Sequence, residues 1–205
     1  MDMFSMFAED KEEAKEENVA IFDLETQRSA DEVGWENIDL MYMSVGVVQL
    51  LPENETLVFY EDDAEKMVEL LASRERIVSY NGLHFDNRVL SYYTDINMWD
   101  LPNTDMMLDI NDALGRERSL PLDNVAKATL GGKGKTADPL QVFEWYRKGQ
   151  LDKIKNYCIG DVDITKEVFM YGRTHGEIFF TNRNDKRMST PITWTIRKGE
   201  NNVKG

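Results

Sequence analysis

Three short segments of the sequence place acidic side chains where they can bind metal ions. They are FDLET at residues 22–26, NGLHFD at residues 81–86 and YCIGD at residues 157–161. Cleavage of a phosphodiester bond with two metal ions needs several carboxylates from separate elements, because the cations lie about 3.5 to 4 Å apart and bridge the attacking and leaving oxygens. The three segments are therefore candidates for one shared site.

The first segment follows an apolar run that is typical of a buried strand. Alternation along a strand puts Asp23 and Glu25 on one side and Phe22 and Leu24 on the other, so the two acids can share a cation. The alternative is a strand end that faces solvent, which is the commoner outcome for an isolated pair of this kind in an acidic protein. The preceding apolar run favours the first interpretation.

The other two segments each add one acid. Asp86 follows an apolar strand and a turn that contains glycine, and it begins a helix, where it is either a ligand or a helix cap. Tyr157 and Asp161 are four residues apart on a long predicted helix, so one face carries a hydroxyl and a carboxylate. The alternative is a core tyrosine beside a surface charge.

Taken together and in this order, the three segments resemble the motifs of the DEDD exonuclease superfamily, which includes the proofreading domain of family B DNA polymerases. The third motif of that superfamily is H-x4-D or Y-x3-D. Here Asn156 stands five residues before Asp161 and Tyr157 stands four before it, so the chain resembles the tyrosine branch, DEDDy. The segments FDLETQRSADEVG, SLPLDNVAKATLG and TADPLQ also resemble small predicted exonucleases that stand alone or accompany helicases.

The resemblance implies an α/β, RNase H-like exonuclease fold, a mixed central sheet flanked by helices, and removal of nucleotides from a 3′ end. It implies that four acids bind metal: Asp23, Glu25, Asp86 and Asp161. It also implies that Tyr157 orients the attacking water. Two divalent cations, Mg²⁺ or Mn²⁺, are expected because ligands that are all oxygen suit hard cations.

The substrate expected from the resemblance is the 3′ end of single-stranded DNA or RNA, with DNA favoured. Leu24 and Thr26 are candidates to hold the terminal nucleotide, and Asn81 and Phe85 to bind sugar or stack on a base. Core or turn roles remain open for all four. Two other functions also remain open: an RNA-trimming or structure-specific nuclease, and a non-catalytic domain that binds nucleic acid or recruits a helicase or polymerase partner.

Several other residues are alternative candidates for metal or phosphate binding. Asp105 begins a helix and is expected to be a cap or a supporting partner, and Asp163 points away from Asp161 because the two are two residues apart on a helix. GGKGKT at residues 131–136 lacks the first glycine of a P-loop, since Thr129 stands there, and follows a predicted helix. Basic residues in and near this loop either hold a nucleic-acid backbone or are solvated: Arg116, Arg118, Lys127, Lys133, Lys135, Arg147 and Lys148.

The charge of the chain neither supports nor excludes a phosphodiester substrate. Its formal net charge is −14, from 38 acidic and 24 basic residues, and the acids concentrate in residues 1–115. Affinity for a polyanion normally comes from Lys and Arg. Part of the acidity, however, belongs to the segment before residue 18, and bound divalent cations would invert the potential near the proposed ligands.

The elements that position these residues follow from hydrophobic patterning. We expect strands at 18–24, 41–51, 56–60 and 77–80, helices at 62–73, 85–93, 104–114, 122–130, 139–148 and 151–171, and a closing hairpin from 178–181 and 192–196. The implied domains are an acidic segment (1–17), an exonuclease domain (18–173) and a C-terminal hairpin and tail on the same domain (174–205). One cysteine, no signal peptide and no apolar run long enough to span a membrane favour the cytoplasm.

Overall fold

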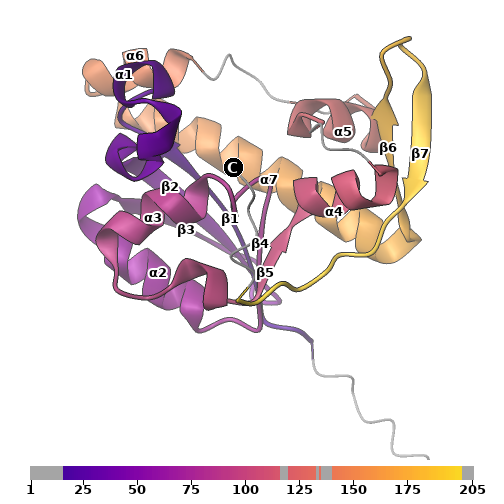
Figure 1. Cartoon of the computed structure of the whole chain (residues 1–205), viewed down its shortest axis with the longest axis horizontal. Helices are drawn as coiled ribbons and strands as arrows, with labels where there is room; N and C mark the ends of the chain where they lie inside the picture. Colours follow the sequence, from indigo (N-terminus) through magenta and orange to yellow (C-terminus); the bar gives the residue numbers. More distant parts are fainter. Residues whose placement is uncertain (1–15, 116–119, 133, 135–139, 200–205) are drawn as a thin grey trace, which may run out of the picture.

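A five-stranded mixed sheet lies at the centre of the protein, whose computed structural model describes residues 16–115, 120–132, 134 and 140–199 (Figure 1). The strands are β1 (Val19–Thr26), β2 (Met43–Leu51), β3 (Glu55–Tyr60), β4 (Arg76–Ser79) and β5 (Asn103–Asp105), in the order β3-β2-β1-β4-β5. The first three strands form an antiparallel meander, and β4 and β5 run parallel to β1. The mixed sheet and the meander confirm the prediction.

Helices cover both faces of this sheet (Figure 1). They are α1 (Ala30–Val33), α2 (Ala64–Ala72), α3 (Asp86–Leu90), α4 (Met106–Leu114), α5 (Leu122–Thr129), α6 (Gln141–Arg147) and α7 (Leu151–His175). Short 3₁₀ segments are η1 (Trp35–Met41), η2 (Glu61–Asp63), η3 (Ser91–Tyr93) and η4 (Met98–Asp100). No helix in the described ranges combines the length and apolar composition that a membrane crossing requires.

The alternation of side chains along β1 divides the core into two halves. Val19 and Ile21 pack with residues of α7, α5 and the C-terminal hairpin, whereas Ala20 and Phe22 pack with residues of α2 and α3. All four side chains have no exposed surface. A strand covered on both faces is expected to be a continuous apolar run, as this segment is. Asp23 and Glu25, which come later in β1, therefore depart from the apolar pattern of a buried strand.

One predicted helix begins later than expected. The helix assigned to residues 104–114 is preceded by strand β5, and α4 begins only at Met106. Three residues are too few to show alternation, and the buried side chains of β5 are all polar, so its sequence carries no apolar signal. Their polar groups are satisfied by hydrogen bonds, such as that from Thr104 Oγ1 to the carbonyl of Thr195.

The second strand of the closing hairpin was predicted wrongly. The hairpin consists of β6 (Glu177–Thr181) and β7 (Arg187–Pro191), and residues 192–196 do not form its second strand. Ile192 and Trp194 are buried, but in an extended segment that continues to an isolated bridge between Arg197 and Asn103. The sequence pattern located the buried apolar side chains correctly but not the backbone pairing, because β7 is exposed along most of its length.

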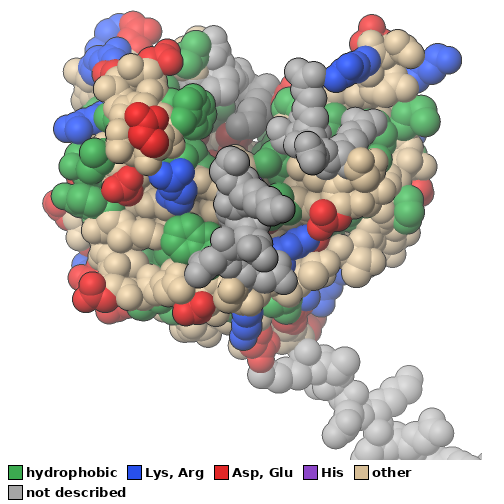
Figure 2. Space-filling view, viewed as in Figure 1, with side chains coloured by type: hydrophobic (Ala, Val, Ile, Leu, Met, Phe, Trp, Pro, Cys, Tyr) green, Lys and Arg blue, Asp and Glu red, His purple; other side chains and the backbone are tan. Residues whose placement is uncertain are grey.

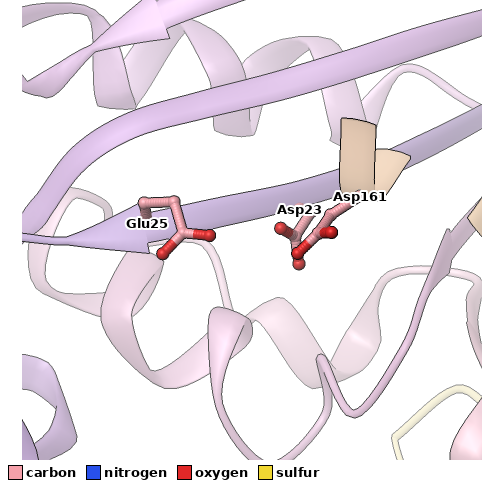
Figure 3. A group of neighbouring side chains, drawn as sticks. All are labelled: Asp23, Glu25 and Asp161. Atoms are coloured by element: carbon pink, nitrogen blue, oxygen red, sulfur yellow. The ribbon is translucent and has the colours of Figure 1, made fainter. Parts of the chain in front are cut away.

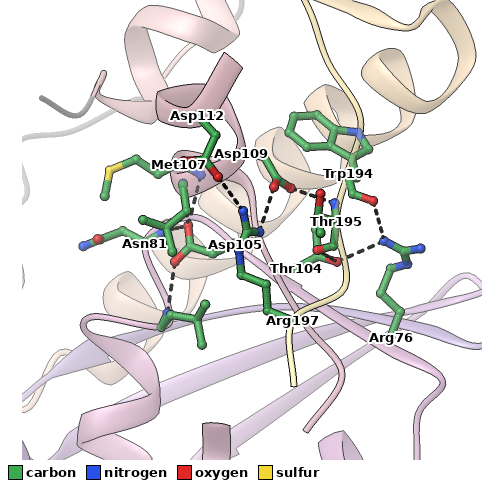
Figure 4. Close-up of polar contacts among 12 residues, drawn as sticks. Arg76, Asn81, Thr104, Asp105, Met107, Asp109, Asp112, Trp194, Thr195 and Arg197 are labelled. Carbon is green, nitrogen blue, oxygen red and sulfur yellow. Dashed lines mark hydrogen bonds and ion pairs between the residues drawn. The ribbon is translucent and has the colours of Figure 1, made fainter. Parts of the chain in front are cut away.

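Arg197 fixes this final segment to the helices (Figure 4). Its guanidinium contacts Asp109 at 2.7 Å and Asp112 at 2.9 Å, both on α4. The backbone N–H of Thr195 donates to Asp109 as well, at 2.9 Å. The segment that contains Thr195 and Arg197 is therefore held at the edge of the sheet beside β5.

Candidate active site

The C-terminal half of β1 carries the first two acids of the site. Phe22 and Leu24 point into the core half that contains α2 and α3. Asp23 and Glu25 consequently point to the opposite face, towards α7, as alternation along the strand requires. Both acidic side chains are partly exposed, so water and ions can reach them.

Helix α7 brings a third acid to the same place (Figure 3). One carboxylate oxygen each from Asp23, Glu25 and Asp161 lies within 4.8 Å of the other two. Asp161 is buried, and its carboxylate faces that of Asp23 in the close-up. Three oxygens at this separation can hold a metal ion, and hard divalent cations are the ions that carboxylates prefer.

Asp86 is tied directly to the strand that bears the first two acids. Its Oδ1 accepts a hydrogen bond of 3.2 Å from the backbone N–H of Leu24. Asp86 is the first residue of α3 and is buried, and the cap position itself is occupied by Phe85. Gly82 makes the preceding turn feasible, because a Cβ there would lie 2.2 Å from Ser79 Oγ and 3.4 Å from Asp86 Oδ2.

Cys158 lies beside Asp23 and was not singled out as a site residue by sequence reasoning. Its thiol donates to the backbone carbonyl of Asp23 at 3.4 Å and to Oδ2 of the same residue at 3.8 Å. Burial, and then the negative charges of four carboxylates, raise the pKa of this thiol well above its ordinary value; the four are Asp23, Glu25, Asp161 and Asp86. The charges of all four predicted acids therefore act on one buried side chain.

Tyr157 lies one helical turn before Asp161 and is buried. Its ring makes an edge-to-face contact with Trp145 on α6, with 6.2 Å between the ring centroids. Aromatic pairs in this arrangement stabilise each other by about 0.5 to 1.5 kcal/mol beyond the area they bury. Sequence reasoning missed Trp145, which helps to orient the tyrosine.

The four residues predicted to bind substrate lie around the acids, and each also has a structural contact. Leu24 packs in the core, and Thr26 Oγ1 donates to the carbonyl of Arg28. Asn81 has a positive φ of 73°, and Phe85 packs against the core half that contains α2 and α3. Their roles in binding a nucleotide remain predictions.

Asp105 supports the site without belonging to the acidic group (Figure 4). Its carboxylate accepts backbone N–H bonds from the turn before Asp86, at Asn81 and Leu83, and from the first turn of α4. This confirms the expected cap and supporting role. Asp163 forms a 3.7 Å ion pair with Lys166 on α7 and is not in the candidate metal-binding group.

The glycine- and lysine-rich loop does not have the setting of a P-loop. It follows helix α5, as predicted, whereas a P-loop follows a strand. Residues 133 and 135–136 of this loop lie outside the described ranges, as do Arg116 and Arg118. Among the other basic residues of the prediction, Lys127, Arg147 and Lys148 pair with acidic side chains.

Comparison with known proteins shows that this chain is similar in fold to solved structures. No family model and no curated protein matches the sequence. A family B DNA polymerase from the hyperthermophilic archaeon Pyrobaculum calidifontis is similar in structure, with a TM-score of 0.58 and 16% identity over 77% of this chain. E. coli Exonuclease I with a dT13 oligonucleotide gives a TM-score of 0.45 and 14% identity over 78% of this chain.

The chain spans only part of these proteins: 25% of the polymerase chain and 41% of the Exonuclease I chain. In a complex of Exonuclease I with SSB-Ct, the likeness has a TM-score of 0.43 and 14% identity, and it covers 88% of this chain and 53% of that one. The likeness to the polymerase shows the fold of this protein, a mixed α/β architecture whose central sheet is flanked by helices.

Proposed function

We propose that this protein is a metal-dependent 3′-to-5′ exonuclease that acts on single-stranded nucleic acid, with DNA favoured over RNA. The observation that carries the proposal is the convergence of three carboxylates from β1 and α7 within 4.8 Å. A fourth, Asp86, is bonded to the backbone of the same strand. The fold and the resemblance of the three motifs to those of DEDD exonucleases support the same conclusion.

The four acids fit a pair of Mg²⁺ or Mn²⁺ ions, because carboxylate oxygens suit hard cations. Asp23, Glu25 and Asp161 would hold one ion, and Asp86, buried beside Leu24, would join Asp23 in holding the second. When bound, such ions supply water of lowered pKa and neutralise charge on the phosphate.

The chain's own residues have separate tasks in this proposal. Tyr157, fixed by Trp145, orients the attacking water with its hydroxyl. Leu24 and Thr26 position the terminal nucleotide, while Asn81 and Phe85 contact its sugar or base. Positioning of this kind lowers the barrier because the reactants are already aligned when they meet.

The test uses single-stranded DNA labelled at its 5′ end, with Mg²⁺, Mn²⁺ or EDTA. The wild type should produce a ladder that shortens from the 3′ end with either metal and no products with EDTA. Asp23→Asn and Asp161→Asn should lower the rate by at least about 100-fold, since each loses a metal ligand. Asp163→Asn is the matched control on the same helix and should cleave like the wild type.

The same assay separates the alternatives. Faster cleavage of labelled RNA than of DNA would replace the proposed substrate by RNA, and internal products would indicate a structure-specific nuclease. Binding without cleavage in either metal would contradict the catalytic role and favour a domain that recruits a helicase or polymerase.

A further inference from the structure

We infer that the tip of the β6–β7 hairpin binds the phosphate backbone of single-stranded nucleic acid whose 3′ end lies at the carboxylates. This inference rests on the proposed function, and it assigns a separate substrate-binding surface to residues 182–187. The surface consists of the loop between the two strands and the first residue of β7.

The hairpin tip has a defined shape. The N–H of Asn182 bonds to the carbonyl of Lys186 at 2.9 Å, and the N–H of Asp185 bonds to the carbonyl of Asn182 at 3.1 Å. The bond between Asn182 and Lys186 encloses residues 183–185, and the last of these, Asp185, is left-handed with a φ of 54°. Asn182 Oδ1 also accepts from the backbone N–H groups of Asn184 and Lys186, which fixes the loop internally.

The tip concentrates positive charge on a protein whose net charge is −14. It carries Arg183, Lys186 and Arg187 against the single acid Asp185, and all four side chains are exposed. None of the three cations forms an ion pair with another residue in the described ranges. Many basic residues elsewhere do, including Arg74, Arg76, Lys127, Lys148 and Arg197. Cations without acidic partners are the side chains that can replace the counterions of a polyanion.

The hairpin is anchored so that its tip is presented in one orientation. The side-chain amide of Asn124 on α5 forms two hydrogen bonds with the backbone of Thr181, both of 2.9 Å. Thr129 Oγ1 makes two more with Phe179, at 2.9 and 3.0 Å. The Arg187 guanidinium lies 3.5 Å from the centroid of the Phe179 ring. A cationic group held in this way loses little conformational entropy when it binds a phosphate.

The base of the hairpin lies at the far end of α7 from Asp161, so we assign the tip to nucleotides upstream of the bond that is cut. The hairpin rises on the side of the molecule towards which β1 and β4 point (Figure 1). Figure 2 shows a hollow at the top of the molecule, with Lys and Arg side chains at the hairpin tip beside it. From Asp161, helix α7 continues to His175, about 21 Å along the helix axis, and the hairpin begins two residues later, at Glu177.

The test compares Arg183→Gln/Lys186→Gln with Lys66→Gln/Lys198→Gln, which removes two exposed cations away from the hairpin. Binding of long single-stranded DNA is measured against salt concentration in Asp23→Asn backgrounds with Mg²⁺, so that cleavage does not interfere. Two lost phosphate contacts should reduce the salt slope by about 1.4, which weakens binding about 25-fold near 0.1 M salt and hardly at all near 1 M. Circular dichroism checks that every variant is folded.

Cleavage by the otherwise wild-type enzyme is measured on a dinucleotide and on a long oligonucleotide. The hairpin variant should raise KM for the long substrate only and leave kcat on the dinucleotide unchanged. Unchanged binding and an unchanged salt slope would overturn the hairpin assignment even if cleavage is normal. Absence of cleavage in the wild type, with the salt effect present, would instead overturn the proposed enzyme and leave the binding surface standing.

Discussion

One of the four acids is oriented by a backbone hydrogen bond that the chain itself supplies. Asp86 accepts from the N–H of Leu24, while the thiol of Cys158 lies beside Asp23 and is nearer to its backbone carbonyl than to its carboxylate. The bond to Asp86 fixes one carboxylate oxygen before any cation arrives. Such preorganisation matters because a site that is loose by about 1 Å loses much of its rate advantage.

Tyr157→Phe tests the proposed role of the hydroxyl. The ring and its contact with Trp145 remain, so stability should change little, whereas kcat should fall by on the order of 100-fold because the water is no longer aligned. Tyr171→Phe is the control, since Tyr171 lies on the same helix but stacks on His175. Steady-state kinetics on labelled DNA measures both, and an unchanged kcat in Tyr157→Phe would leave the hydroxyl with a packing role only.

Cys158 should resist alkylation in the native protein. Burial and the surrounding carboxylates raise the pKa of the thiol above its ordinary 9.0, so the folded state binds this proton more tightly than the unfolded chain does. The stabilisation is complete below pH 9.0 and is lost as pH rises through the native pKa.

At pH 9.0 we therefore expect iodoacetamide to label the unfolded chain quickly and the native protein very slowly. Mass spectrometry after timed quenching measures the label, with the reaction in denaturant as the positive control. Equal rates in both states would contradict the burial of the thiol beside the acids.

At the scale of residues, strand alternation predicted that Asp23 and Glu25 lie on one side of their strand, whereas the approach of Asp161 to them was expected only from the resemblance of the motifs. It was not sufficient to predict the contacts of Cys158 with Asp23, which is 135 residues away in the chain. Trp145 was missed for the same reason: no local pattern distinguishes an aromatic residue that packs on Tyr157 from any other core residue.

At the scale of elements, α7 fits closely against the C-terminal segment through a glycine. A Cβ at Gly172 would lie 2.6 Å from Cζ2 of Trp194, so Gly172→Ala should lower the free energy of unfolding by about 1 to 3 kcal/mol. At Gly160 on the same helix, no described atom lies within 4 Å of an added Cβ. Gly160→Ala should therefore raise the free energy of unfolding by about 1 kcal/mol, from helix propensity alone.

Urea denaturation of both glycine variants gives the comparison. If both variants have a higher free energy of unfolding than the wild type, helix propensity, and not contact with Trp194, dominates at Gly172.

Asn124→Ala tests the attachment of the hairpin to α5. The substitution removes both hydrogen bonds to Thr181 and should cost about 1 to 3 kcal/mol of unfolding free energy, because the backbone groups left behind are partly buried. Asn184→Ala, at the exposed tip, should change stability by less than about 0.5 kcal/mol. Hydrogen exchange should show faster exchange at the Thr181 amide in Asn124→Ala only, and slow exchange there would contradict the anchoring.

Elements with a strong apolar pattern were predictable, and polar ones were not. The meander and α7 follow from long periodic runs, although α7 continues to His175 before Gly176 ends it. Strand β5 was missed because its three residues are polar and are stabilised by contacts from distant segments. The strand β7 was misplaced because its exposed, polar sequence is typical of a turn.

At the scale of the whole molecule, we expect the clustered acids to make stability depend on metal. Three carboxylates within 4.8 Å repel one another, so divalent cations should raise the Tm of the wild type. A ligand at about 100 times its Kd contributes about 2.7 kcal/mol. In EDTA, Asp161→Asn should be more stable than the wild type, because one repelling charge is gone.

Thermal unfolding with EDTA, Mg²⁺ and Mn²⁺ measures this dependence, with Asp163→Asn as the matched control. The control should gain stability from metal as the wild type does, and Asp161→Asn should gain much less. A wild-type Tm that does not change with either metal would exclude the acids as a cation site.

The acids come from segments that are far apart in the chain: Asp161 follows Asp23 by 138 residues. Ribosomes make proteins from the N-terminus, so β1, β4 and α3 emerge well before α7 does. A nascent chain that ends before Leu151 lacks Asp161 and holds an incomplete ligand set. The carboxylate group would thus be complete only after α7 has been made and has docked, and the return of cation binding during refolding would report the docking of α7.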